Sequence, residues 1–144
     1  MNKPMSNCAT GTNLLFVYGT LMEGLREGWK KKVGAHFVGR GRITGKLYDL
    51  GEYPGAVSST DPRRQVEGEV YRLDDPGRAT GILDQYEEHL PSRPDKSLFI
   101  REKLPVTMKD GTKKRAWVYL YNRSVNEADF IPGGNYRERI SAGR

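Results

Sequence analysis

The chain has 144 residues, a formal net charge of +6 and a single cysteine. This length suits one domain around one hydrophobic core. One cysteine excludes an intramolecular disulfide framework and is typical of a reducing compartment, so we expect a cytoplasmic protein. No apolar run approaches the length of a membrane span, and we expect no membrane partner.

Composition divides the chain into three parts. Residues 1–13 are polar and small and predict a flexible leader, 14–137 predict one domain, and 138–144 resemble a polar tail. Cys8 lies in the leader with no histidine nearby in sequence, which favours an incidental exposed thiol over a nucleophile. The two histidines lack the spacing of metal ligands, so we predict no metal site.

The most informative segment is Leu14–Leu21, where four apolar residues end at a Tyr-Gly-Thr turn. The run predicts a strand buried on both faces, and a glycine at its end permits a sharp turn and the close approach of a ligand. Successive backbone N–H groups in such a turn can converge on a carboxylate. The alternative is an ordinary buried strand that ends in a glycine turn. Taken on its own, the Tyr-Gly-Thr tripeptide favours this alternative.

The middle of the chain is predicted to be mostly strand. Residues 37–48 partly alternate and carry three glycines, which indicates a long, bent or bulged strand compatible with barrel-like closure. A turn at 51–55, a short strand at 56–58 and a further strand at 66–73 follow.

The hydrophobic period then changes to that of a helix. Asp75 suits the N-cap and Pro76 the first helical position, and Pro91 ends the pattern. Glu87 falls on the same side as Leu83, at the margin of the apolar stripe. Poor solvation there would raise the pKa of Glu87 and make it a stronger base, whereas a solvated helix glutamate paired with a basic residue is the alternative.

Residues 98–108 and 112–121 predict two strands that form a hairpin. Strands with one principal helix between them predict an α+β domain with a largely antiparallel sheet.

Short basic clusters at 30–32 and 113–115 raise the question of nucleic-acid binding. They lack the interleaved aromatic residues of a stacking platform, so a solvated surface is favoured and no nucleic-acid partner is expected.

Five segments in order resemble the gamma-glutamylcyclotransferase-like family, in its avirulence-induced-gene-like branch. They are 18–21, 45–57, 66–71, 83–87 and 116–121. The resemblance implies a mixed α+β, barrel-like sheet with the site at one end of the strands and one principal helix that carries a catalytic glutamate. The chain departs from the family pattern in a charged insertion over 88–96 and in residues 132–136, where substrate selectivity could be set.

The resemblance also implies roles for particular residues. Glu87 corresponds to the general base, and the glutamyl part of the substrate is held by the loop of Tyr18, Gly19, Thr20 and Leu21. Tyr121, near the end of the last strand, is a further candidate hydroxyl donor to the substrate, with a tyrosine at the core edge as the alternative.

The implied reaction is the intramolecular cyclisation of a gamma-glutamyl compound, which releases 5-oxoproline and an amine without a cofactor. The substrate's own α-amine is the nucleophile, so the expected partner is a small molecule. The alternative is a catalytically silent module that binds a small carboxylate or another protein on the same fold. The identity of the gamma-glutamyl compound and the oligomeric state are left open.

Overall fold

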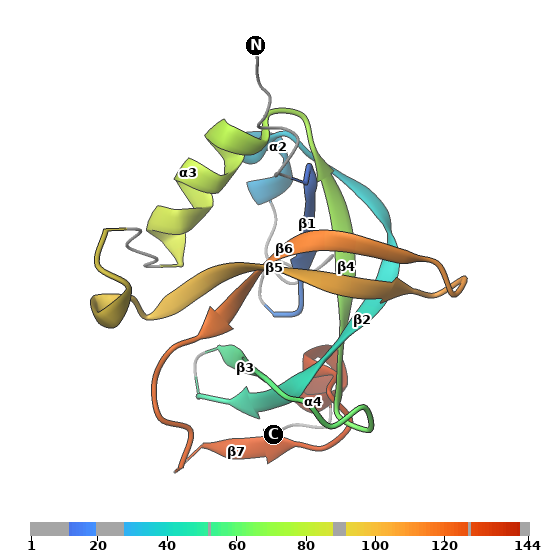
Figure 1. The fold of residues 1–144 in the computed structure, drawn as a ribbon, viewed down its shortest axis with the longest axis vertical. Helices are drawn as coiled ribbons and strands as arrows, with labels where there is room; N and C mark the ends of the chain where they lie inside the picture. The colour runs from blue at the N-terminus through green and yellow to red at the C-terminus, as the bar shows by residue number, and fades with distance from the viewer. Residues whose placement is uncertain (1–11, 20–27, 52, 88–91, 127, 142–144) are drawn as a thin grey trace.

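The computed structural model describes residues 12–19, 28–51, 53–87, 92–126 and 128–141 (Figure 1). The elements in chain order are β1 (Leu14–Val17), α2 (Trp29–Val33), β2 (Ala35–Asp49), β3 (Pro54–Ser58), β4 (Gln65–Leu73), α3 (Pro76–Tyr86), the 3₁₀ turn η1 (Pro94–Lys96), β5 (Phe99–Met108), β6 (Lys113–Tyr121), β7 (Asp129–Ile131) and α4 (Tyr136–Ser141). None of the helices in these ranges is long and apolar enough to cross a membrane.

Five strands close into a barrel in the order β2-β4-β1-β6-β5, with a final pairing between β5 and β2. Four of the five pairings are antiparallel, and β1 runs parallel to β6. Strands β3 and β7 both pair with the far end of β2, and Figure 1 shows them with α4 at the opposite end of the molecule from α2 and α3. The predicted α+β, barrel-like fold is confirmed.

Strand β2 links the barrel to its flanking strands. It pairs with β4 over residues 35–44 and with β3 over 45–49, and its register on β4 shifts between Phe37 and Gly39. A bulge bends a strand and increases its twist. At Gly45 an added Cβ would lie 2.8 Å from the carbonyl oxygen of Val57, so the two backbones approach too closely for a side chain. The predicted long, bulged strand is confirmed.

Helix α3 begins as its sequence predicts. The Asp75 carboxylate accepts the backbone N–H of Arg78 at 3.2 Å, with Pro76 in the first turn. The helix ends at Tyr86, earlier than the predicted stop before Pro91, and Glu87 is its C-cap residue. Residues 88–91 lie outside the described residues.

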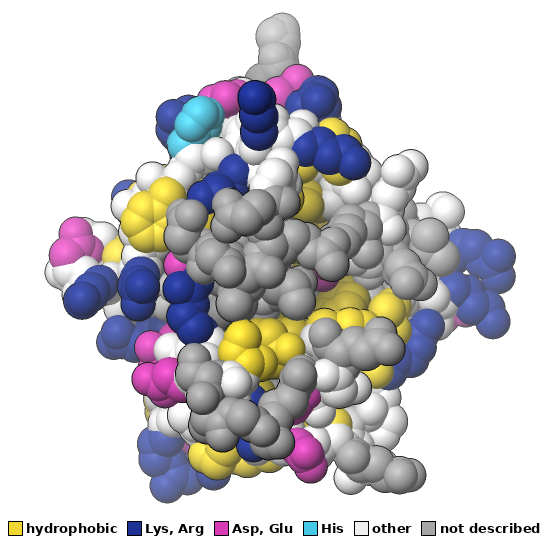
Figure 2. All heavy atoms as spheres, turned by 180° about the vertical axis from the view of Figure 1, so that it is seen from behind, with side chains coloured by type: hydrophobic (Ala, Val, Ile, Leu, Met, Phe, Trp, Pro, Cys, Tyr) yellow, Lys and Arg dark blue, Asp and Glu magenta, His cyan; other side chains and the backbone are white. Residues whose placement is uncertain are grey.

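The sequence patterns missed α2, β7 and α4. In α2 the only buried side chains are those of Trp29 and Val33, and the Trp29 ring packs edge-on to Tyr71 at 5.0 Å. The three lysines of the predicted basic cluster occupy the rest of this short helix. Figure 2 shows Lys and Arg side chains in several separate groups around the rim of one face.

Every barrel strand contributes to the core. The largest fully buried side chains include Phe16 of β1, Ile43 of β2, Val66 and Val70 of β4, Val106 of β5 and Val118 of β6. These strands carry apolar residues at the positions that face the interior, which explains the β-branched content of their sequences.

The C-terminal segment is held against β4. The Gly134 carbonyl accepts the N–H of Glu67 at 2.7 Å, and the Arg137 guanidinium lies 3.5 Å from the buried Glu69 carboxylate, which also accepts the Tyr71 hydroxyl at 2.9 Å. Helix α4 continues past residue 138, the expected start of the tail, and Arg139 donates to the Asp49 carboxylate at 3.3 Å.

We expect Gly134→Ala to lower the free energy of unfolding by about 1–3 kcal/mol. Gly134 has a φ of 67°, and an added Cβ would lie 1.8 Å from the carbonyl oxygen of Gln65. Gly133→Ala is the matched control, because nothing lies within 4 Å of a Cβ added there. Urea unfolding measures both variants, and equal stability of the two would contradict this account of the close approach.

Candidate functional site

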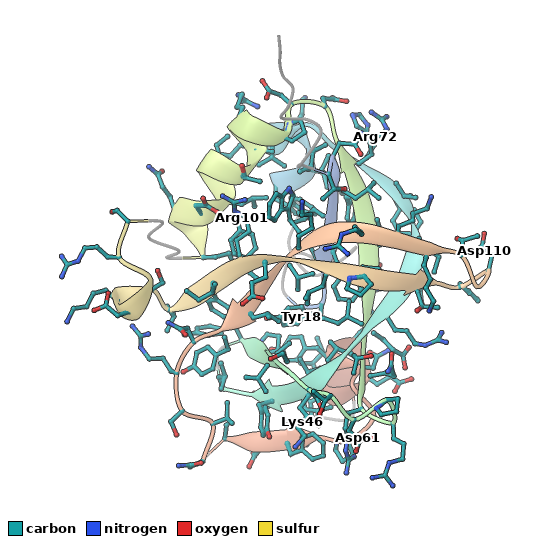
Figure 3. All side chains as sticks on the ribbon, viewed as in Figure 1. Tyr18, Lys46, Asp61, Arg72, Arg101 and Asp110 are labelled. Carbon is teal, nitrogen blue, oxygen red and sulfur yellow. The ribbon has the colours of Figure 1, made fainter. Side chains whose placement is uncertain are left out.

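Tyr18 directly follows β1, and its hydroxyl joins three strands. It donates to the backbone carbonyl of Tyr119 on β6 at 2.6 Å and accepts the backbone N–H of Ala56 on β3 at 3.1 Å. Tyr18 as a whole residue is 6 % exposed. Figure 3 shows Tyr18 in the space between β6 and β3. The turn that the sequence singled out therefore begins inside the barrel end rather than on its surface.

Glu87, the C-cap residue of α3, is half-buried, and its negative charge contributes to the raised pKa of two tyrosines. Burial is the main cause of the raised pKa of Tyr18, the hydrogen bond from Ala56 opposes it, and the negative charge of Glu87 adds to it. The same charge contributes to the raised pKa of Tyr119, where burial and the neighbouring Asp84 are the larger causes. The carboxylate therefore lies within electrostatic reach of the end of β1 and of β6.

An ion pair between a buried carboxylate and a half-buried guanidinium lies one helical turn before Glu87. The Asp84 carboxylate accepts Nε and Nη2 of Arg101, from β5, at 2.8 and 3.2 Å. It also accepts the Tyr119 hydroxyl at 2.5 Å. The Arg101 guanidinium lies over the ring of Trp117, 4.6 Å from its centroid. Sequence reasoning missed this cluster, because nothing in the local pattern connects a helix aspartate with a strand arginine.

Gly19 is packed against the first residue of β3. A Cβ added to Gly19 would lie 2.7 Å from Cγ of Pro54, so a larger residue would push β3 away from the loop. The structure thus places Tyr18 and Gly19 beside β3, with Glu87 in reach of the Tyr18 phenol. Thr20 and Leu21, the other predicted loop residues, lie outside the described residues.

Tyr121 lies two residues beyond Tyr119 on β6. Its ring packs edge-on to Phe99 at 5.5 Å, and its Cβ is 2.9 Å from the position of a Cβ added to Gly55. Tyr121 is half-buried at the junction of β6 with β3. This position agrees with either of its predicted roles, a substrate-facing hydroxyl or a tyrosine at the core edge.

Few residues in the part of the chain that the structure describes are candidate metal ligands. No group of three His, Cys, Asp or Glu side chains there could hold a metal ion. His36 pairs with the exposed Asp74 at 2.8 Å. Cys8 and His89 lie outside the described residues, so the assignment of Cys8 as an incidental thiol stays a prediction.

Residues 15–138 match the family model described as "Gamma-glutamyl cyclotransferase, AIG2-like". The gamma-L-glutamyl-butirosin B gamma-glutamyl cyclotransferase of Niallia circulans is 31 % identical over 131 residues, which cover 90 % of this chain and 80 % of the relative.

Two solved structures have the same fold. The solution structure of Escherichia coli YtfP matches with a TM-score of 0.60 and 29 % identity, over 88 % of this chain and 98 % of that one. The crystal structure of a mouse AIG2-like protein matches with a TM-score of 0.66 at 24 % identity, over 83 % and 86 % of the two chains.

We expect Tyr18→Phe to lower the free energy of unfolding by about 1–3 kcal/mol at neutral pH, because it deprives the buried Ala56 N–H of its acceptor. Tyr48→Phe is the control. The Tyr48 ring is half-buried against Phe130 at 5.4 Å, and we expect a change within about 0.5 kcal/mol. Equal losses in the two variants would show that the Tyr18 hydroxyl contributes nothing particular to the barrel end.

The same pair of proteins gives a pH test. The folded-state pKa of Tyr18 is raised above its ordinary value of 10.0, so the protonated phenol stabilises the fold below that pH, and this contribution is lost as the pH rises above it. The free energy of unfolding of the wild type should therefore fall more steeply above pH 10 than that of Tyr18→Phe. Parallel pH profiles would contradict the raised pKa.

Proposed function

The chain belongs to the gamma-glutamyl cyclotransferase, AIG2-like family, and we propose that it is a cofactor-independent enzyme that cyclises a gamma-glutamyl amide. The substrate's α-amine attacks its own γ-carbonyl, a five-membered lactam forms, and the C–N bond to the leaving amine breaks. The products are 5-oxoproline and a free amine. The observation that carries the proposal is the family match over residues 15–138, and it is supported by the charge of Glu87, which acts on the phenols of Tyr18, after β1, and Tyr119, on β6.

Glu87 is the general acid and base in this proposal. Its carboxylate accepts one proton from the attacking amine, and the resulting carboxylic acid returns one proton to the leaving nitrogen, so the ionised form is regenerated in each cycle. Positioned proton transfer of this kind contributes about 10²–10⁴-fold to a rate. The position of Glu87 supports this role. Glu87 is half-buried and directly follows the last residue of α3, so the packed helix fixes the backbone that carries the carboxylate.

The turn after β1 holds the glutamyl group. We assign the substrate α-carboxylate to the backbone N–H groups of Gly19, Thr20 and Leu21, since consecutive amides in a turn can converge on an anion. Pro54 packs against Gly19 and leaves no space there for a side chain. Holding the chain bent toward its own γ-carbonyl can supply several kcal/mol of the barrier reduction. Tyr121 is the further candidate hydroxyl donor to the bound substrate.

The proposed substrate class is a gamma-glutamyl amide of an amine or amino acid. The relative from Niallia circulans is named for gamma-L-glutamyl-butirosin B, and cyclisation needs only the gamma-glutamyl part, which is common to the whole class. The identity of the leaving amine is therefore to be determined by assaying substrates that differ in it.

Release of 5-oxoproline from a panel of substrates tests the proposal. The panel contains glutathione, a gamma-glutamyl amino acid, the gamma-glutamyl isopeptide of lysine and a gamma-glutamyl aminoglycoside. Turnover of at least one compound is the expected result. Binding of these compounds by calorimetry with no release of 5-oxoproline would instead identify a catalytically silent binding module.

We expect Glu87→Gln to lower kcat by at least ~100-fold, because the amide keeps the shape of the side chain but cannot accept the proton. Affinity for the gamma-glutamyl substrate should persist. Glu138→Gln, in the exposed first turn of α4, is the charge-matched control and should retain wild-type turnover. Near-wild-type release of 5-oxoproline by Glu87→Gln would remove Glu87 as the base.

A further inference from the structure

The last turns of α3 are anchored to the barrel through one buried carboxylate. Asp84, a buried residue of α3, accepts two hydrogen bonds from Arg101 of β5 and a third from the Tyr119 hydroxyl of β6. Two parallel N–H donors on one carboxylate fix its orientation as well as its position. Glu87 follows Asp84 by three residues, and its backbone N–H donates to the carbonyl of Leu83 at 2.8 Å, so the anchored segment leads directly into the C-cap.

Arg101 is itself held in place. Its guanidinium lies over the Trp117 ring, and Arg101 pairs directly with Tyr119 in the antiparallel register of β5 and β6. Its side chain is 20 % exposed, whereas that of Asp84 is 12 % exposed. The pair therefore lies in a region where water screens charge only in part, and each charge acts on its neighbours.

We propose that Asp84 and Arg101 are positioning residues for Glu87, which orient the last turn of α3 and balance the charge beside the general base. This inference rests on the proposed function. It adds an electrostatic role to a pair that could otherwise serve only to attach the helix.

Tyr119 links the charges. Its phenol donates to Asp84, and it is also within electrostatic reach of Glu87, so both carboxylates act around one hydroxyl group. Two such carboxylates disfavour each other's ionised form unless a cation balances one of them. Arg101 supplies that cation at Asp84. The negative charge of Asp84, three residues before Glu87, is thereby compensated within the ion pair.

The charged and titratable groups that the described structure links to Glu87, directly or through Asp84 and Tyr119, include residues of four elements. They are Tyr18 after β1, Asp84 on α3, Arg101 on β5 and Tyr119 on β6. Both tyrosines stay neutral at working pH because burial raises their pKa. The ion pair is therefore the part of this set whose charge can be altered by substitution.

The test is a titration of the Glu87 side-chain carboxyl by ¹³C NMR in the full chain, assigned with Glu87→Gln. Asp84→Asn leaves the Arg101 cation unbalanced and should lower the pKa of Glu87, whereas Arg101→Met leaves the Asp84 anion unbalanced and should raise it. We expect shifts of about half a pH unit or more in opposite directions. The double variant should return the pKa toward the wild-type value.

Two matched substitutions control for a general change in charge. Asp110→Asn, in the exposed β5–β6 turn, and Arg63→Met, on an exposed loop, should leave the titration of Glu87 unchanged. Where turnover is measurable, the acid limb of kcat against pH should move with the NMR value in each variant.

Shifts of the same sign in the two single variants, or no shift in either, would overturn the inference and leave a purely structural ion pair. If Asp84→Asn does not fold, Arg101→Met and Arg101→Lys decide the matter. Lysine keeps the charge but loses the two-point geometry, so only the methionine variant should raise the pKa. The titration needs no substrate, so absence of 5-oxoproline release would contradict the proposed function without deciding this inference.

Discussion

One buried hydroxyl group determines how the barrel end is assembled. The Tyr18 phenol donates to β6 and accepts from β3, so the strand that precedes the loop is attached to two strands at once. Ala56 is fully buried, and an N–H without an acceptor there would cost about 1–3 kcal/mol. The phenol must stay protonated to donate to the Tyr119 carbonyl, and its raised pKa ensures this.

The position of β3 follows from this constraint. Its first two residues, Pro54 and Gly55, lie against Gly19 and Tyr121, and both glycines occupy places where a Cβ would approach within 3 Å of a neighbouring atom. Glycine at both places allows β3 to approach the loop and β6 closely enough for the Ala56 N–H to reach Tyr18. The same residues therefore bring Gly19, the start of the loop, and Tyr121 to the same end of β3.

Features with a local signal were predictable from the sequence. The Asp75-Pro76 start of α3, the glycine-rich bend of β2 and the β5–β6 hairpin each depend on residues close together in the chain. Closure of the barrel between β2 and β5 was not specified by any local pattern, because it depends on a pairing across more than sixty residues. Helix α2 was missed because it has only five residues and three of them are lysines.

The candidate site was also predictable only where its residues have a local sequence signal. The glycine turn after β1 and the helix-margin position of Glu87 were visible in the sequence, although Glu87 proves to be the C-cap rather than an interior helix residue. The contact between Asp84 and Arg101 was not, since the two residues are 17 apart on different elements. The hydrogen bonds of Tyr18 likewise join residues 38 and 101 positions away. Long-range polar contacts of this kind have no sequence period to reveal them.

We propose that the gamma-glutamyl group binds and cyclises at the barrel end beside Tyr18. A crystal structure of the protein with 5-oxoproline bound tests it most directly. We expect to find the lactam next to Gly19, with its carboxylate on the backbone N–H groups of the loop and its ring within reach of the Glu87 carboxylate. Binding of 5-oxoproline at any other place, with the region beside Tyr18 empty, would contradict the account.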